Sequence, residues 1–310
     1  MEQIMVDMNQ IQADYNALEF VSFMDEEEKW YFDTHGYIIV RNVLSKKDAE
    51  YLIEKFEEWR KLPDDEVPAP MNRSLETRVF QNMHYIEKKY QDLILEPRIM
   101  KYVSSLLLHN PRLMFCSMIR QKKDGKRKKH SNKKQEEKLQ KLLQNGNILL
   151  HRDTNGYNYP YEAFINPLIG YQVVNGIIHS GYINVSITLV DIPKDHGIAL
   201  IPGSHKSSFN TPTIKTDDPF KDYIQSFELS AGDAIVFAPN LLHTTRKWVM
   251  DYSRYTVFNR YVFGKYIEEG FRNHSFEEYK DNLSEEMYEL EQMNLMKEKK
   301  IVKRLKRIYT

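Results

Sequence analysis

Cysteine is almost absent from this sequence, since Cys116 is the single one among 310 residues. One cysteine excludes a disulfide framework and any zinc or iron–sulfur site made from several thiolates, and it suits a reducing compartment. A run of about 18 apolar residues, the length of a membrane-spanning helix, is missing as well. The first 20 residues contain Glu2, Asp7 and Asp14 but no Lys or Arg, unlike a secretory signal or a transit peptide. We therefore expect a cytoplasmic protein without a membrane span.

Net charge is also missing, because 44 Lys and Arg balance 44 Asp and Glu. This balance argues against a general binder of polyanions, and 41% hydrophobic residues argue against disorder. No repeat of about 20 to 50 residues is visible, which disfavours a solenoid or a propeller. A chain of this length fits one elaborated domain that needs no metal or disulfide for its stability.

Apolar residues at helical spacing predict helices at both ends of the chain. Ser45-Lys46-Lys47-Asp48 has the form of a capping box, and the helix that it starts should end near Pro63. A second helical pattern covers residues 93–108. From Leu283 to the C-terminus, acidic residues come first and basic residues last, as the helix dipole favours. The seven Lys and Arg between Lys297 and Arg307 fit a packed amphipathic helix better than a membrane or partner anchor.

Strand patterns dominate the second half of the chain, after an early apolar run at Tyr37–Val40. In residues 183–189, apolar and polar side chains alternate with period two. Residues 198–201, 234–237 and 255–263 are rich in β-branched, aromatic and other apolar residues. Because Gly and Pro turns separate these short strands, we predict an antiparallel sandwich or barrel.

A basic stretch precedes these strands. Between Arg120 and Lys141 there are eleven Lys or Arg and three acidic residues, with few apolar residues among them. We predict a solvated surface loop that runs into a short helix. The cluster Lys122–Lys134 could also attract phosphates, a coenzyme A ester or a nucleic acid, since clustered cations raise the local concentration of anions.

Two histidines and one aspartate are candidates for a metal site. Residues i and i+2 of a strand point to the same face, so the side chains of His151 and Asp153 converge. His243 lies ninety residues after Asp153 and could complete a facial triad, which leaves three positions of an octahedral iron open. Each residue alone has a simpler interpretation as an ordinary hydrogen-bonded His or Asp. The donor set also suits manganese or zinc.

Arg254 begins an apolar strand eleven residues past His243. Inside a barrel, its planar and permanently charged fork would hold a dicarboxylate through two parallel hydrogen bonds. An Arg in this place is commonly a surface residue or half of an ion pair. Arg260 competes for the role, because it lies on the same strand with the same side-chain direction.

Several short motifs follow one another between about residues 30 and 290. They are Phe32-Asp33-Thr34-His35-Gly36-Tyr37 before Asn42-Val43-Leu44-Ser45, then Asp195-His196-Gly197 before Ile201-Pro202-Gly203-Ser204-His205-Lys206, and finally Ala231-Gly232-Asp233 before Phe237, His243 and Arg254. Their combination and order resemble the phytanoyl-CoA dioxygenase family of Fe(II)/2-oxoglutarate-dependent oxygenases.

The resemblance implies a mainly β fold, a double-stranded β-helix (a cupin-like jelly roll) with N-terminal and C-terminal helices. It implies Fe(II) as cofactor and 2-oxoglutarate as co-substrate. By motif position, His151, Asp153 and His243 would be the iron ligands. Arg254 would bind the distal carboxylate of 2-oxoglutarate, and Thr245 falls where relatives often have a hydroxyl that helps to hold it.

We expect a single catalytic domain over residues 1–310. Its parts would be an N-terminal elaboration (1–119), a basic insertion loop (120–147), the jelly-roll core with the metal site (148–265) and C-terminal helices (266–310).

Three other positions bear on the resemblance. His196 and His205 belong to turn motifs and are expected to be structural. Ser186 occupies the strand position where relatives often have a Trp near the co-substrate. Related halogenases have a small residue in place of the ligand carboxylate, so the intact Asp153 favours hydroxylation.

The leading hypothesis is a dioxygenase that uses molecular oxygen to hydroxylate a small or medium-sized metabolite, releasing succinate and carbon dioxide. An oxygenase acting on a nucleic acid or protein is the first alternative, for which the basic insertion is the only indication. A non-catalytic jelly-roll scaffold is the second. Tyr157, Tyr159, Tyr161, Phe164 and Tyr171 could form an aromatic wall of the substrate pocket or a packed loop outside the barrel.

Overall fold

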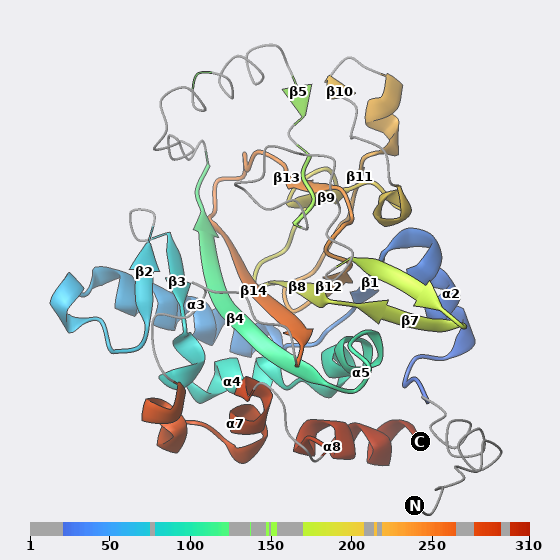
Figure 1. The fold of residues 1–310 in the computed structure, drawn as a ribbon. Coiled ribbons are helices and arrows are strands. Elements are labelled where there is room, and N and C mark those ends of the chain that lie inside the picture. The colour runs from blue at the N-terminus through green and yellow to red at the C-terminus, as the bar shows by residue number, and fades with distance from the viewer. Residues whose placement is uncertain are drawn as a thin grey trace, which may run out of the picture.

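Two layers of antiparallel strands form the centre of the protein, and helices cover the outer face of the larger layer (Figure 1). The computed structural model describes residues 21–74, 78–123, 137, 147–148, 150–153, 170–207, 214–215, 219–264, 276–292 and 298–310. The helices are α2 (Glu26–His35), α3 (Lys46–Lys61), α4 (Lys88–Ile94), α5 (Pro97–Leu106), α7 (Glu285–Glu291) and α8 (Lys300–Tyr309). Five short 3-10 turns occur at Asp64–Glu66, Met83–Tyr85, Ser204–Lys206, Pro219–Tyr223 and Phe276–Asn282 of the described chain.

The strands of the larger sheet run in the order β1-β12-β8-β14-β4-β3-β2, and each neighbouring pair is antiparallel. Their bounds are β1 (Tyr37–Val40), β2 (Asn72–Ser74), β3 (Val79–Gln81), β4 (Pro111–Gln121), β8 (Tyr182–Thr188), β12 (Ala234–Phe237) and β14 (Arg254–Phe263). The predicted mainly β fold with helical additions is confirmed. The sheet draws on a wider span than residues 148–265, because β1 to β4 precede residue 148 and pair with strands that come later or lie beside them.

The smaller sheet has the order β11-β9-β13. Its strands are β9 (Ile198–Leu200), β11 (Gln225–Ser226) and β13 (His243–Thr245). Two separate two-stranded sheets complete the strands described: β5 (Asn147–Ile148) pairs with β10 (Ile214–Lys215), and β6 (Tyr171–Val174) forms a hairpin with β7 (Ile177–Ser180).

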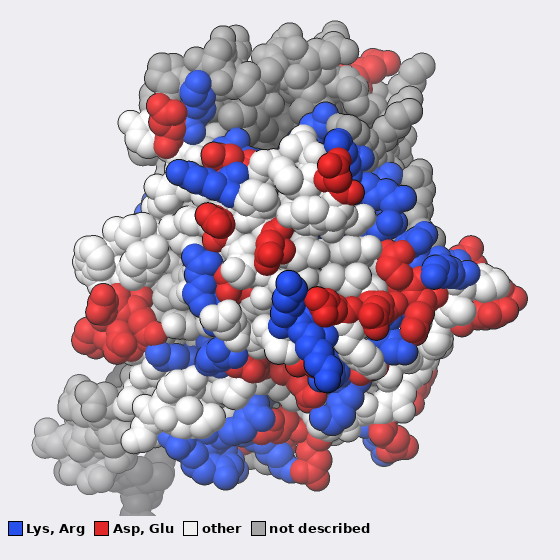
Figure 2. Space-filling model, turned by 180° about the vertical axis from the view of Figure 1, so that it is seen from behind, with Lys and Arg blue, Asp and Glu red and all other residues white. Residues whose placement is uncertain are grey.

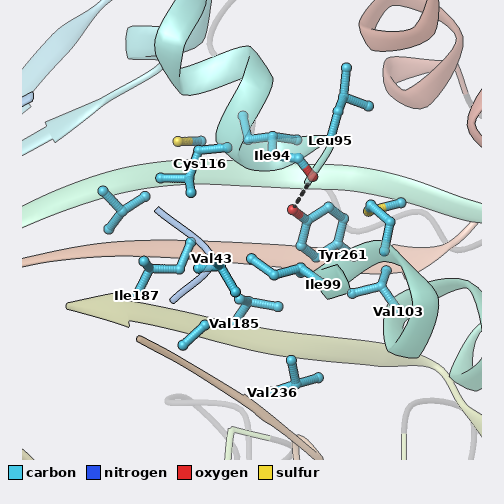
Figure 3. Packing of buried hydrophobic residues seen from close by; sticks show 14 of the residues in the cluster. Val43, Ile94, Leu95, Ile99, Val103, Cys116, Val185, Ile187, Val236 and Tyr261 are labelled. Carbon is cyan, nitrogen blue, oxygen red and sulfur yellow. Dashed lines mark hydrogen bonds between the residues drawn. The ribbon is translucent and has the colours of Figure 1, made fainter. Parts of the chain in front are cut away.

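Strand alternation separates a helix-facing core from the space between the sheets. Along β8, Ile183, Val185 and Ile187 belong to the large apolar cluster that also contains residues of α3, α4 and α5 (Figure 3). Tyr261 of β14 joins this layer and donates its hydroxyl hydrogen to the carbonyl oxygen of Ile94 at 2.8 Å. The residues between these positions point to the opposite face, toward the smaller sheet. Apolar burial on one face therefore directs the alternating polar residues into the interior between the sheets.

Local signals explain most helix boundaries. Ser45 caps α3 by accepting from the main-chain N–H of Asp48. The predicted helix over 93–108 is two helices instead, because Pro97 lacks an N–H and starts α5 as a separate element. The predicted C-terminal helix is α7 followed by α8, and three apolar residues of α8 are fully buried: Ile301, Val302 and Leu305. The basic C-terminal segment is thus a packed amphipathic helix, as predicted.

The Ala231-Gly232-Asp233 motif forms a turn that fastens β12 to the segment after β1. Gly232 has φ +94°, and a Cβ there would overlap the main-chain oxygen of Leu44. The buried carboxylate of Asp233 pairs with Arg41 at 2.6 Å and accepts from the N–H groups of Asn42 and Ser230 at 2.9 Å each. Two motifs that are far apart in the sequence are therefore in direct contact.

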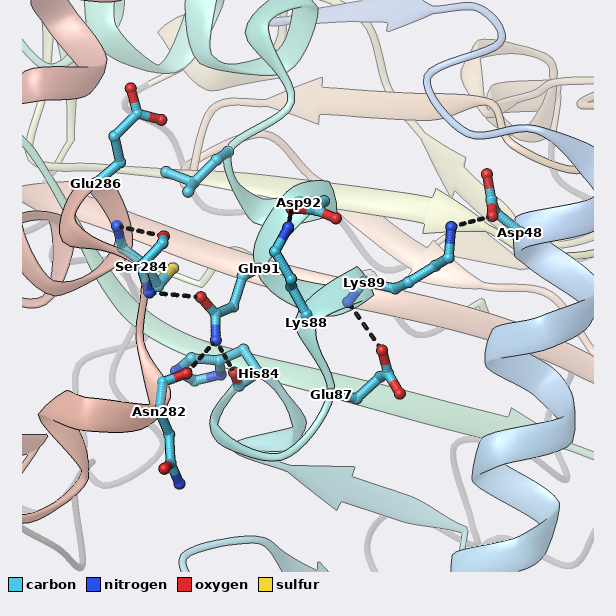
Figure 4. A network of polar contacts seen from close by, with 12 residues as sticks. Asp48, His84, Glu87, Lys88, Lys89, Gln91, Asp92, Asn282, Ser284 and Glu286 are labelled. Atoms are coloured by element: carbon cyan, nitrogen blue, oxygen red, sulfur yellow. Dashed lines mark hydrogen bonds and ion pairs between the residues drawn. The ribbon is translucent and has the colours of Figure 1, made fainter.

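Polar contacts attach the C-terminal helices to α4 (Figure 4). Gln91 is only 4% exposed, and its Nε2 donates to the carbonyl oxygens of His84 at 2.8 Å and Asn282 at 2.7 Å. Its Oε1 accepts from the N–H of Ser284 at 3.0 Å. The buried pair His84–Glu291, 2.9 Å apart, joins the same segments. On the surface, Lys and Arg lie among Asp and Glu over the face in Figure 2, as expected for a chain without net charge.

Gln91→Leu should lower the free energy of unfolding by about 1–3 kcal/mol, the cost of leaving a buried polar group without its hydrogen bond. The substitution removes the buried contact with the carbonyl oxygen of His84, and it also removes two part-buried contacts with the main chain of Asn282 and Ser284. Urea unfolding followed by tryptophan fluorescence measures the change. The matched control on the same helix is Lys88→Ala, which removes only an exposed ion pair with Asp92. Equal stability of both variants would show that the C-terminal helices do not depend on Gln91.

Candidate metal centre

His151, Asp153 and His243 meet between the two sheets. Nε2 of His151 lies 3.6 Å from Asp153 Oδ1, and Nε2 of His243 lies 3.8 Å from the same oxygen. One ligand atom from each residue lies within 4.8 Å of the other two, and no second group of this kind occurs in the described residues. Two imidazole nitrogens and one carboxylate oxygen around one point are the donor set of a facial triad, and Fe(II) fits it.

Main-chain pairing brings the two histidines together. The N–H of each donates to the carbonyl oxygen of the other at 3.0 Å, an antiparallel bridge that adds His151 to the edge of β13. The N–H of Asp153 then donates to the carbonyl oxygen of Pro239 at 2.9 Å. Ordinary sheet hydrogen bonds thus bring together two histidines that are 92 residues apart in the sequence, and the positions of their side chains follow from the backbone register.

His243 is held in the tautomer that a metal needs. Its Nδ1 lies 2.8 Å from the carbonyl oxygen of Leu241, which can only accept, so Nδ1 carries the hydrogen. The lone pair of Nε2 therefore faces Asp153. Fixing the second ring nitrogen in this way is common for metal-bound histidines.

The electrostatics keep the carboxylate ionised. Burial by itself would raise the pKa of Asp153, but His243, Arg260 and His151, together with a hydrogen bond from Asn184, bring it below its ordinary value. Desolvation in the site, followed by the neighbouring His243, lowers the pKa of His151 to about 4. Even so, 48% of the His151 side-chain surface is exposed, so this ring lies at the mouth of the site.

Arg152 lies between His151 and Asp153 in the sequence, and its side chain faces away from theirs. This buried guanidinium donates to the carbonyl oxygens of Asn240 at 3.0 Å, Ser204 at 3.1 Å and Ser207 at 3.2 Å. These acceptors belong to the loop before His243 and to the turn of the Pro-Gly-Ser-His motif. Arg152 thus fixes the His151–Asp153 segment against the segment that carries His243.

Arg254 is a buried cation with few polar partners for its charge. The residue is 8% exposed, and burial lowers the pKa of its guanidinium to about 10, so it stays charged at neutral pH. Nη1 donates to the amide oxygen of Gln121 at 3.3 Å, whereas the buried Nε has no acceptor. No carboxylate of the described residues forms an ion pair with it. A buried cation without a counter-ion is costly, so an anionic ligand is the natural partner.

Gly197 provides room beside Arg254. It has φ +71°, and a Cβ there would lie 2.8 Å from Ile192 Cγ2 and 3.9 Å from Arg254 Cζ. Thr245, opposite Ile198 in the smaller sheet, is exposed, and no hydrogen bond links it to Arg254 in the described structure. Its expected part in co-substrate binding stays a prediction.

Other residues singled out in the sequence lie elsewhere in the structure. His205 is buried against Asp33, whose carbonyl oxygen lies 3.1 Å from Nε2. His196 is half-buried, with Nδ1 3.0 Å from the carbonyl oxygen of Lys194. Neither belongs to the metal group. Ser186 is buried on β8, opposite Phe258 of β14. Tyr157, Tyr159, Tyr161, Phe164 and all but the first residues of the basic cluster Lys122–Lys134 lie outside the described residues.

Two contacts of Asp153 were missed by sequence reasoning. Asn184 Nδ2 and Arg260 Nη2 each donate to Asp153 Oδ2 at 2.7 Å. Asn184 had a signal, since it is one of the polar residues that alternate with Ile183, Val185 and Ile187 along β8. Arg260 was considered only for the co-substrate, and its partner Asp153 lies 107 residues away in sequence.

Comparison with known families gives the class of the protein. The sequence profile of the phytanoyl-CoA dioxygenase (PhyH) family matches residues 32–254, a range that includes the triad and Arg254. The chain belongs to the phytanoyl-CoA dioxygenase family. Members are Fe(II)- and 2-oxoglutarate-dependent oxygenases, so the predicted enzyme class and cofactors are confirmed.

Solved structures show the same fold. HygX from Streptomyces hygroscopicus, with nickel, 2-oxoglutarate and hygromycin B bound, is 17% identical with a TM-score of 0.55, over 77% of this chain and 87% of that chain. EctD from S. alaskensis, with 2-oxoglutarate and 5-hydroxyectoine, is 15% identical with a TM-score of 0.54, over 78% and 77%. The predicted jelly roll is confirmed. No curated protein gave a significant match.

None of the helices described is long and apolar enough to cross a membrane.

Proposed function

We propose that this protein is a dioxygenase that uses Fe(II), 2-oxoglutarate and molecular oxygen to hydroxylate a small or medium-sized organic metabolite, releasing succinate and carbon dioxide. One observation carries the proposal. A buried arginine without a counter-ion in the described chain, Arg254, lies on the same inward face of β14 as Arg260, which contacts the ligand Asp153. Cation and triad thus share one interior, which suits a dicarboxylate that also reaches a metal.

Each residue has a defined task in this proposal. His151, Asp153 and His243 would bind the iron through one face and leave three positions open. Bound iron with 2-oxoglutarate supplies the oxidising power for hydroxylation. Arg254 would bind the distal carboxylate through two parallel hydrogen bonds from its planar guanidinium, and so direct the 2-oxo acid end toward the metal. Thr245 is kept as a weaker contact of the same carboxylate.

Two observations support the finer points. A carboxylate at Asp153 occupies the place that a halide would need, which favours hydroxylation over halogenation. HygX and EctD, which share the fold, were solved with the small molecules hygromycin B and 5-hydroxyectoine. A macromolecular substrate had its support in the basic insertion, and residues 124–136 and 138–146 lie outside the described structure.

Anaerobic addition of Fe(II) and 2-oxoglutarate should produce a weak visible charge-transfer band, and aerobic turnover should produce succinate. His151→Ala, Asp153→Ala and His243→Ala should each abolish both signals, because each removes one of three iron ligands. The variants should remain folded by circular dichroism, since these side chains line an interior and do not build the apolar core. Wild-type iron affinity and turnover in His243→Ala would remove this residue from the triad.

Arg254→Ala should weaken 2-oxoglutarate binding by ~30-fold to several thousand-fold, because truncating one partner of a buried charge pair costs about 2–5 kcal/mol. Arg254→Lys should also be impaired, since an ammonium group cannot form the bidentate contact. Isothermal titration with 2-oxoglutarate on the Mn²⁺-loaded protein measures both. If Arg260→Ala loses more 2-oxoglutarate affinity than Arg254→Ala at saturating metal, Arg260 is the co-substrate arginine.

A further inference from the structure

Arg260 binds the oxygen of Asp153 that the histidines do not face. Its Nη2 donates to Asp153 Oδ2 at 2.7 Å, whereas Oδ1 lies 3.6 and 3.8 Å from the two imidazole nitrogens. The two carboxylate oxygens therefore have different surroundings. One is directed at the metal position, and the other is bound to protein.

Asn184 closes this contact into a ring of three side chains. Its Nδ2 donates to Asp153 Oδ2 at 2.7 Å, and its Oδ1 accepts from Arg260 Nε at 2.9 Å. Asn184 is fully buried, so water does not compete for its hydrogen bonds with Asp153 and Arg260. A carboxylate held at one oxygen by a charged donor and an amide cannot rotate to offer both oxygens to a metal.

Two features fix the guanidinium of Arg260 itself. It lies between the rings of Phe115 and Tyr182, with Cζ 5.1 and 4.7 Å from their centroids, the arrangement of a double cation–π contact. The register of β14 with β4 shifts directly after Arg260, where Met114 is an extra residue on β4. Such bulges redirect side chains beside active sites.

We propose that Arg260 is a positioning residue that, together with Asn184, holds Asp153 as a one-oxygen ligand. The proposal rests on the proposed function and adds a reason for the open coordination sphere. If Oδ2 were free, the carboxylate could bind through both oxygens and occupy a position needed by 2-oxoglutarate or oxygen. Arg260 thus acts through Asp153, whereas Arg254 on the same strand face acts on the co-substrate.

If Arg260 acted only through its charge, its removal would change the metal affinity in the opposite direction from a loss of positioning. A cation beside Asp153 weakens the attraction of the carboxylate for a divalent ion, so its removal would tighten metal binding. Loss of orientation instead weakens metal binding, by about 10- to 100-fold for outer-sphere partners of metal ligands. The direction of the change in metal affinity therefore separates the two roles.

The test is titration of the full-length, metal-free protein with Mn²⁺, with free Mn²⁺ measured by electron paramagnetic resonance. Arg260→Met keeps an apolar side chain between the two rings and should bind Mn²⁺ about 10- to 100-fold more weakly, with an unfolding midpoint near wild type. Arg260→Lys should recover part of the affinity through one hydrogen bond. Asn184→Ala should also weaken binding, and the double variant should lose less than the two single losses combined, because both act on Oδ2.

Arg254→Met is the matched control from the same strand face, and it should keep Mn²⁺ affinity within about twofold while weakening 2-oxoglutarate. Unchanged or tighter Mn²⁺ binding by a folded Arg260→Met protein overturns the positioning role and leaves the proposed function intact. If the wild type binds Mn²⁺ no better than His243→Ala does, the metal centre itself is refuted, and with it both proposals.

Discussion

The main-chain bridge between His151 and His243 is the contact on which the metal centre depends. Two reciprocal hydrogen bonds of 3.0 Å place two residues that are 92 positions apart in the sequence directly opposite one another. Because side chains alternate along strands, this register turns both imidazoles and the carboxylate of Asp153 toward one point. Shifting the pairing by one residue would turn the ligands outward, so the apolar packing that sets the register also sets the site.

Strand β14 carries residues with different roles on its two faces and along its length. Its odd-numbered positions Tyr255, Val257 and Tyr261 pack in the helix-facing core and hold the strand in place. Its inward positions include Arg254 and Arg260, whose hydrogen-bond partners differ. Arg260 is satisfied by Asp153 and Asn184 and stacked between aromatic rings, whereas the buried Nε of Arg254 has no acceptor. The satisfied arginine suits a part of the protein's own framework, and the unsatisfied one suits a ligand.

The sequence predicted much of this site because the chemistry is concentrated in short motifs. His151, Asp153 and His243 could be named from their pattern, and strands such as β8 and β14 from their alternation. The strand pattern did not separate Arg254 from Arg260 as the arginine that binds the co-substrate, because both side chains point to the same face of the strand. Only their contacts in the folded protein differ. Asn184 was missed, since its contact with Asp153 depends on strands brought together by tertiary pairing. The helix α2 was also missed, although the Asp25–Glu28 capping box is a local signal for it.

The metal centre is tested most directly by a crystal structure of the protein with Ni²⁺ and 2-oxoglutarate, since Ni²⁺ occupies such a site without supporting turnover. We predict one metal ion bound by His151, His243 and a single oxygen of Asp153, with the distal carboxylate of 2-oxoglutarate on Arg254. A metal bound elsewhere, or a distal carboxylate on Arg260 with the Asp153 contact broken, would contradict this prediction.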